Sequence, residues 1–262
     1  MNLSISPTTR SMLNKVPEIT IYFWIIKILA TTVGETAADF LNVNLHLGLT
    51  GTSIVMGMLL LAFLVVQIRA NKYVPWIYWL TVVLLSIFGT LLTDNLVDNF
   101  GVTLQTTTTL FSVALIATFV CWYVSEKTLS IHSIFTTKRE LFYWAAILFT
   151  FALGTAAGDL AAEGLQLGYA PSALIFGGLI AVVTIAYYVF KANAVAAFWI
   201  AYILTRPFGA SCGDFLSQPT ANGGLGLGTI GTSALFLLTI LALVGYLTVT
   251  RRNEACARGD IA

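Results

Sequence analysis

Seven of the twelve acidic residues in this sequence lie where long apolar segments end, and their spacing suits ion chemistry. The seven are Glu35, Asp39, Asp94, Asp98, Asp159, Glu163 and Asp214. The first six form three consecutive pairs with an i, i+4 spacing, which stacks two carboxylates on one helix face if the helix continues that far. Two such carboxylates in an apolar medium must hold a proton, meet a base or bind a cation.

Two basic residues lie inside the apolar segments and are the candidate partners of these acids. Lys27 lies eight residues before Glu35, and Arg206 lies eight residues before Asp214. We expect both to be internal counter-charges that occupy the acids when no ligand is bound. A metal held by carboxylates alone would be a hard divalent ion such as Mg²⁺, Ca²⁺ or Mn²⁺, and protons fit the same residues equally well.

The elements that must position these residues are membrane-spanning helices. Hydrophobic residues make up 58% of the sequence, charged residues make up 10%, and the mean hydropathy is +0.87. These values are typical of a membrane protein and not of a soluble domain. Apolar runs long enough to cross ~30 Å of hydrocarbon as helices occur eight times. They cover residues 19–41, 47–68, 74–95, 102–124, 141–161, 168–190, 193–216 and 227–249.

The basic residues predict how the chain is oriented. Eleven of the thirteen lie before the first apolar run or after the second, fourth, sixth and eighth. The four other connections, residues 42–46, 96–101, 162–167 and 217–226, contain no Lys or Arg. The positive-inside rule therefore predicts a multi-pass membrane protein whose four basic-free connections face outward, with residues 1–18 and 251–262 as cytoplasmic tails. The start of the chain shows no cleavage pattern, so we expect it to be a leader into the first helix.

A fourfold repeat organises the chain. Each copy has a tryptophan, a glycine ten residues later and an aspartate fifteen residues later, and the copies are 55, 65 and 55 residues apart. The tryptophans are Trp24, Trp79, Trp144 and Trp199, the glycines are Gly34, Gly89, Gly154 and Gly209, and the aspartates are Asp39, Asp94, Asp159 and Asp214. The repeats cover residues 19–72, 74–127, 139–191 and 193–250 of one membrane domain.

Each repeat contains two helices, so all four repeats point the same way across the membrane. The glycine and the small residue four positions later give the first helix of each repeat a face that allows close backbone approach. We therefore expect an all-α fold of eight transmembrane helices, in which the first helices of the repeats line the centre. The tryptophans are expected to be interface anchors.

This signature resembles a family of bacterial integral membrane proteins built from four tandem two-helix repeats, catalogued as a repeat of unknown function (DUF347). The resemblance covers the chain from about Tyr22 to the end of the eighth helix, and all four Trp, Gly and Asp sets match. It implies an eight-helix membrane protein. It implies no activity, because no function is established for the family.

The repeated carboxylates favour a transporter or permease that handles a small cation or another small solute. In this hypothesis the four aspartates are the central ligands, and Glu35, Asp98 and Glu163 are auxiliary ligands or proton carriers. The alternative is a non-transporting scaffold or sensor whose acids and bases form buried ion pairs that fix helix packing. Two simpler roles also stay open: the acids mark helix ends in outward water, or they accept hydrogen bonds from neighbouring helix N-termini.

No catalytic function is expected. The segment 209–213 matches the Gly-x-Ser-x-Gly nucleophile pattern, but it lies in an apolar helix and not in a strand-to-helix turn. We expect no cofactor, no nucleic-acid partner and contact with the lipid bilayer. The sequence does not predict the oligomeric state.

Overall fold

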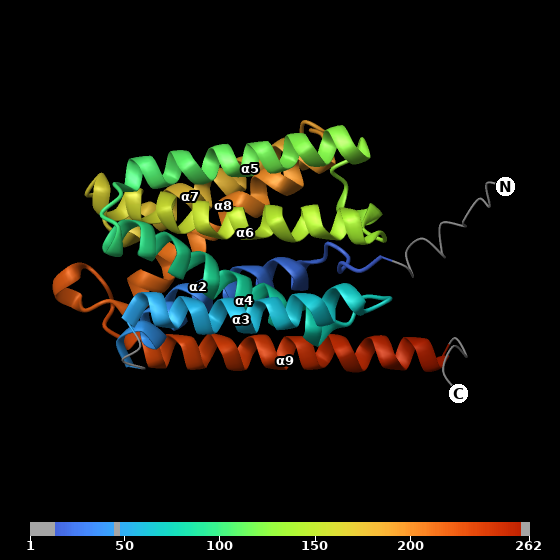
Figure 1. Ribbon diagram of the computed structural model, residues 1–262, viewed down its shortest axis with the longest axis horizontal. Coiled ribbons are helices and arrows are strands. Elements are labelled where there is room, and N and C mark those ends of the chain that lie inside the picture. The colour runs from blue at the N-terminus through green and yellow to red at the C-terminus, as the bar shows by residue number, and fades with distance from the viewer. Residues whose placement is uncertain (1–13, 45–47, 258–262) are drawn as a thin grey trace.

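The computed structural model describes residues 14–44 and 48–257, and within these ranges it contains helices and no strands. The ends of the two expected tails, residues 1–13 and 258–262, lie outside the described residues. The long helices run side by side along the molecule (Figure 1). They are α2 (Ile21–Asn44), α3 (Gly48–Arg69), α4 (Pro75–Asp94), α5 (Leu104–Glu126), α6 (Thr137–Asp159), α7 (Tyr169–Tyr188), α8 (Ala194–Ser217) and α9 (Gly228–Ala257).

Eight of the described helices, taken with the short turns that extend two of them, are long and apolar enough to cross a membrane. The predictions of an all-α fold and of eight spans are therefore confirmed, with ends that differ by a few residues. The helices alternate in direction, so the acids at the ends of the motif helices share one end of the bundle, here called the acidic end. The opposite end is called the basic end. The start of the described chain and the C-terminal end of α9 both lie there (Figure 1).

The helices form an inner ring and an outer ring. In the spans of α2, α4, α6 and α8, between 56% and 78% of the residues in the most apolar window are buried. In the other four spans the share is between 6% and 22%. The first helix of each repeat therefore lines the centre, as the small-residue pattern predicts.

The motif glycines lie where neighbouring inner helices approach most closely. A Cβ atom on Gly34 would lie 1.8 Å from Ser86 Oγ of α4, and one on Gly154 would lie 2.1 Å from Arg206 Cγ of α8. Gly89 meets α6 and Gly209 meets α2 in the same way, with Cβ distances of 2.7 and 2.6 Å. Each glycine thus faces the inner helix of the next repeat, and the fourth faces the first, so the ring is closed.

The outer helices also hold neighbouring repeats together by packing across them. Helix α3 packs on α4, α5 on α6, α7 on α8, and α9 returns to α2. Each outer helix therefore packs mainly on the inner helix of the following repeat and much less on that of its own. This interlocking makes the four repeats one structural unit and not four independent hairpins.

Two of the four inner helices end in a wider turn. Helix α4 continues into the π-helical segment η1 (Asn95–Asn99), and α6 continues into η3 (Leu160–Gly164). Asp98 and Glu163 lie in these π turns, so they do not keep the regular i, i+4 α-helical relation to Asp94 and Asp159 that their spacing suggests. The remaining pair, Glu35 and Asp39, lies within regular α2.

The expected role of the tryptophans as interface anchors is wrong for three of the four. Trp79, Trp144 and Trp199 are 2–4% exposed, and only Trp24 is half-buried. They pack near the basic end in an aromatic cluster with Phe23, Tyr78, Tyr143, Phe198 and Tyr202. The tryptophans occupy equivalent positions on the inner helices, and these helices form a closed ring. The buried tryptophan side chains therefore face the protein interior and not the lipid.

Candidate functional site

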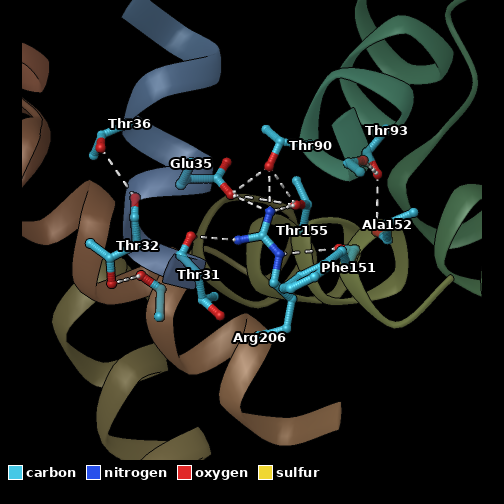
Figure 2. Close-up of polar contacts among 12 residues, drawn as sticks. Thr31, Thr32, Glu35, Thr36, Thr90, Thr93, Phe151, Ala152, Thr155 and Arg206 are labelled. Atoms are coloured by element: carbon cyan, nitrogen blue, oxygen red, sulfur yellow. Dashed lines mark hydrogen bonds and ion pairs between the residues drawn. The ribbon is translucent and has the colours of Figure 1, made fainter. Parts of the chain in front are cut away.

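One layer of side chains crosses the middle of the inner ring. The residue after each motif glycine lies in this layer, and the four residues are Glu35, Thr90, Thr155 and Ala210. Arg206 lies one turn before Ala210 on α8 and extends its side chain into the layer (Figure 2). The absence of a side chain at Gly154 makes room for its aliphatic stem.

The Arg206 guanidinium contacts three other inner helices. Its Nη2 lies 3.1 Å from Glu35 Oε2 and donates to Thr155 Oγ1 at 2.6 Å and to Thr90 Oγ1. Its Nη1 donates to the carbonyl oxygen of Thr31 at 3.1 Å, and Nε donates to that of Phe151 at 3.3 Å. Because Arg206 is fully buried, this ion pair is shielded from water and fixes the four repeats to one another.

The two threonines complete the hydrogen bonds of Glu35. Thr90 Oγ1 donates to Glu35 Oε2 at 3.2 Å, and Thr155 Oγ1 donates to the same oxygen at 3.4 Å. Each hydroxyl therefore accepts from Arg206 and donates to the carboxylate, as a hydroxyl can do (Figure 2). Neither threonine was among the site residues predicted from the sequence. Both occupy the same position in their repeats as Glu35 does in the first, and this shared position could have identified them.

Of the two buried bases expected to be counter-charges, Arg206 forms an ion pair with one of the seven described acids, and Lys27 does not. Arg206 pairs with Glu35 of α2 and not with Asp214 of its own helix. Lys27 forms no ion pair within the described ranges. Its Nζ lies 3.3 Å from Thr31 Oγ1 and over the rings of Tyr202 and Phe151, 4.3 and 4.8 Å from their centroids. A separation of eight residues is about 12 Å along a helix, so a partner one turn away on a neighbouring helix is closer.

Three carboxylates converge beside this layer. Glu35, Asp159 and Asp214 come from α2, α6 and α8, and each offers an oxygen within 4.8 Å of the other two. Glu35 and Asp214 are 5% and 8% exposed, and Asp159 is half-buried. Among the described residues, the carboxylates of Asp159 and Asp214 have no hydrogen-bond donor and no ion-pair partner. We call these three residues the carboxylate triad. Its geometry and oxygen ligands can hold a hard cation.

The other predicted acids surround the carboxylate triad. Asp39 and Asp94 lie within electrostatic range of Glu35, and Asp98 lies within range of both aspartates. Glu163 lies within range of Asp159 and Asp214, and its Oε1 accepts from Tyr169 OH at 3.1 Å. The fold thus brings all seven acids into one region, although only three of them share a possible ligand position. Arg206 is the one base that forms an ion pair with any of the seven in the described ranges.

A second buried ion pair lies near the basic end. Lys15 precedes α2, and its Nζ lies 2.8 Å from Glu140 Oε2 of α6 and donates to the Ile68 carbonyl at the end of α3. Glu140 is 1% exposed and also accepts from Gln67 Nε2 and Trp144 Nε1. From the sequence, Lys15 contributed only to the prediction of how the chain is oriented in the membrane. Its partner belongs to the third repeat, and no local pattern joins the two.

Comparison with known proteins gives a family and no activity. Four stretches of the chain, residues 22–73, 77–128, 142–193 and 197–253, match the family described as Repeat of Unknown Function (DUF347). No curated protein and no solved structure matches the chain.

Proposed function

Since the chain belongs to the DUF347 repeat family, whose description names no function, we propose a function from the geometry of the site, namely a transporter for a small cation. The cation is bound by the carboxylate triad, Glu35, Asp159 and Asp214. The convergence of these three carboxylates from three repeats is the observation that carries the proposal. Asp39, Asp94, Asp98 and Glu163 act as auxiliary ligands or proton carriers around it.

The charge balance of the carboxylate triad supports a cationic ligand. Asp159 and Asp214 have no hydrogen-bond donor and no ion-pair partner among the described residues, although Arg206 lies within electrostatic range of Asp159. Buried carboxylates without direct partners are costly. A cation that binds there supplies the missing positive charge. The ligands are carboxylate oxygens, which favours a hard divalent ion or a proton over a thiol-seeking metal.

Arg206 gives the site a way to exchange its occupant. It pairs with Glu35, a member of the carboxylate triad, so an entering cation competes with the guanidinium for the same carboxylate. The layer formed by Arg206, Thr90 and Thr155 also fills the ring beneath the triad. Passage of a cation therefore requires Arg206 to leave this layer, which links binding to a conformational change.

In this proposal the protein lies in the bacterial cytoplasmic membrane, with both termini in the cytoplasm and the acidic end facing outward. The orientation rests on the positive-inside rule. The exposed bases Arg69, Lys72 and Lys138 at the basic end then face the cytoplasm.

A cation panel tests the proposal directly. Purified protein is heated with Mg²⁺, Ca²⁺, Mn²⁺ or monovalent ions, because a ligand that binds only the folded state raises the melting temperature. Flux of the ion that stabilises the protein is then measured in liposomes. Asp159→Asn and Asp214→Asn are expected to remain folded and to lose both the shift and the flux, whereas Glu126→Gln at the basic end keeps both. Normal flux in both aspartate variants would exclude this mechanism.

The contacts of Arg206 also favour a second function. A guanidinium bonded to three neighbouring inner helices, together with the Lys15–Glu140 pair, is what a non-transporting scaffold or sensor would use to fix its packing. That function predicts that neutralising any one of the aspartates destroys the folded protein. The variants above therefore separate the two functions by the yield of folded protein before any flux is measured.

A further inference from the structure

An apolar groove runs along the membrane-facing side of the bundle between α3 and α6. Its volume is about 300 Å³, and its floor is formed by Leu85 and Phe88 of α4. Leu61 and Leu64 line one wall, and Leu141 and Ala145 line the other. The lining contains no charged side chain. Since Leu61 and Leu141 are 64% and 53% exposed, the groove is open to the surrounding medium, which for a membrane-spanning helix is lipid.

The groove extends through one leaflet. On α3 its lining runs from Gly57 to Ile68, and the eleven helical steps between these two residues span about 16 Å. That length is close to half of the ~30 Å hydrocarbon core. Ile68 is the penultimate residue of α3, and Leu141 lies near the start of α6. The groove therefore begins at the basic end and stops near the middle of the bilayer, as one acyl chain does.

The mouth of the groove is positively charged. Arg69 directly follows Ile68, and Lys72 comes three residues later. Both are exposed and form no ion pair in the described part of the chain. Lys138 lies one turn before Leu141 on the same face of α6, and its side chain is 62% exposed. Two acids of the described residues at this end of the bundle, Glu140 and Glu126, already have partners. Glu140 pairs with Lys15, and Glu126 pairs with Lys138 and Arg139.

We propose that this groove is a binding site for an anionic glycerophospholipid. One acyl chain lies between α3 and α6, and the phosphate lies at the mouth near Arg69 and Lys72. Basic residues next to a pocket between transmembrane helices attract anionic headgroups, and each strengthens their binding near the membrane surface. The positive charge at the mouth favours this occupant over a zwitterionic lipid. The proposal does not depend on cation transport.

The test compares two lipids with identical acyl chains. Delipidated protein in detergent is titrated with phosphatidylglycerol or phosphatidylcholine, and lipid retention is followed by native mass spectrometry and by melting temperature. We expect one phosphatidylglycerol to be retained preferentially. In Arg69→Gln and Lys72→Gln its affinity should fall about fivefold per residue, the factor that corresponds to 1 kcal/mol. Lys191→Gln is the matched control, because it removes an exposed base from the connection after α7.

A second pair of variants tests the acyl-chain position. Ala145→Phe fills the groove from α6, whereas Ala117→Phe adds the same ring to an exposed position on α5. Ala145→Phe should lose the retained lipid and Ala117→Phe should keep it. Leu61→Trp fills the groove from the opposite wall and replaces Ala145→Phe if that variant does not fold. Equal retention of both lipids, retention unchanged by groove filling, or a dimer that covers the groove would each overturn the proposal.

Discussion

The two ends of the bundle treat buried charge in opposite ways. At the basic end the acids that the structure describes as buried or half-buried each have a base: Glu140 pairs with Lys15, and Glu126 pairs with Lys138 and Arg139. At the acidic end seven acids share one region, and Arg206 is the single base paired with any of them in the described part of the chain.

This difference distinguishes structural charge from functional charge. A carboxylate with a base and further donors, such as Glu140, contributes to packing and needs nothing more. Carboxylates such as Asp159 and Asp214, which accept no hydrogen bond from any residue that the structure describes, are unfavourable to the fold unless something else binds to them. Proteins keep such unfavourable groups mainly at functional sites. The acidic end is therefore where the function is to be sought.

Removal of Arg206 should have the largest effect on stability. Arg206→Met leaves Glu35 buried without a base, and breaking a buried ion pair by deleting one partner costs about 3–5 kcal/mol. The measurement is the free energy of unfolding in mixed micelles. The double variant Arg206→Met/Glu35→Met should recover much of the loss, because it removes both charges. If the double variant is as unstable as the single one, the guanidinium acts through its contacts with Thr31 and Phe151 and not through the ion pair.

The corresponding change at the basic end should cost less. Lys15→Met leaves Glu140 without its base, but Gln67 and Trp144 still donate to it. The loss of a hydrogen bond to a charged group predicts a decrease of about 1.5–3 kcal/mol. Lys138→Met, which removes an exposed base from the same end, is the control and should change stability little. A larger loss in Lys15→Met than in Arg206→Met would reverse the contrast between the two ends.

Much of the fold could be predicted from the sequence, because it depends on periodic features. Runs of about twenty apolar residues give the eight spans. The fourfold Trp, Gly and Asp pattern gives the inner helices, because close packing needs small residues at a fixed register. The gathering of the acids at one end follows from the same register. Each of these inferences uses information within one repeat.

The contacts that depend on the closed ring could not be predicted. The partner of Arg206 is Glu35, three repeats away along the chain, and the two meet only because α8 packs against α2. Burial of Trp79 was missed for a related reason. Tryptophan near a helix end suits both a lipid interface and a protein interior, and only the packing of the ring distinguishes them.

The glycines of the inner ring provide a smaller test of how tightly its centre is packed. Gly154→Ala places a Cβ 2.1 Å from Arg206 Cγ and 2.5 Å from Arg206 Cβ, so the Arg206 side chain and the backbone of α8 that carries it must shift. Overpacking of this kind costs about 1–3 kcal/mol. Gly178→Ala on outer helix α7 is the matched control, since nothing lies within 4 Å of its Cβ, and it should be neutral or slightly stabilising. Equal effects at both positions would show that the inner ring tolerates movement of Arg206.

The smallest expected effect is a gain in stability, whereas the variants above lose stability. It tests most directly whether the acidic end differs from the basic end. Without added cation, Asp214→Asn should raise the free energy of unfolding by about 0.5–2 kcal/mol, the gain commonly obtained when an unfavourable charge is removed. Its carboxylate has no donor among the described residues and lies within 4.8 Å of two others, so neutralising it relieves repulsion and breaks no bond. When a cation that binds the wild type is added, the wild type should become more stable than Asp214→Asn, because only the wild type is stabilised by binding. A variant that is less stable than the wild type in the absence of any cation would mean that Asp214 has a packing role, and would favour the scaffold over the transporter.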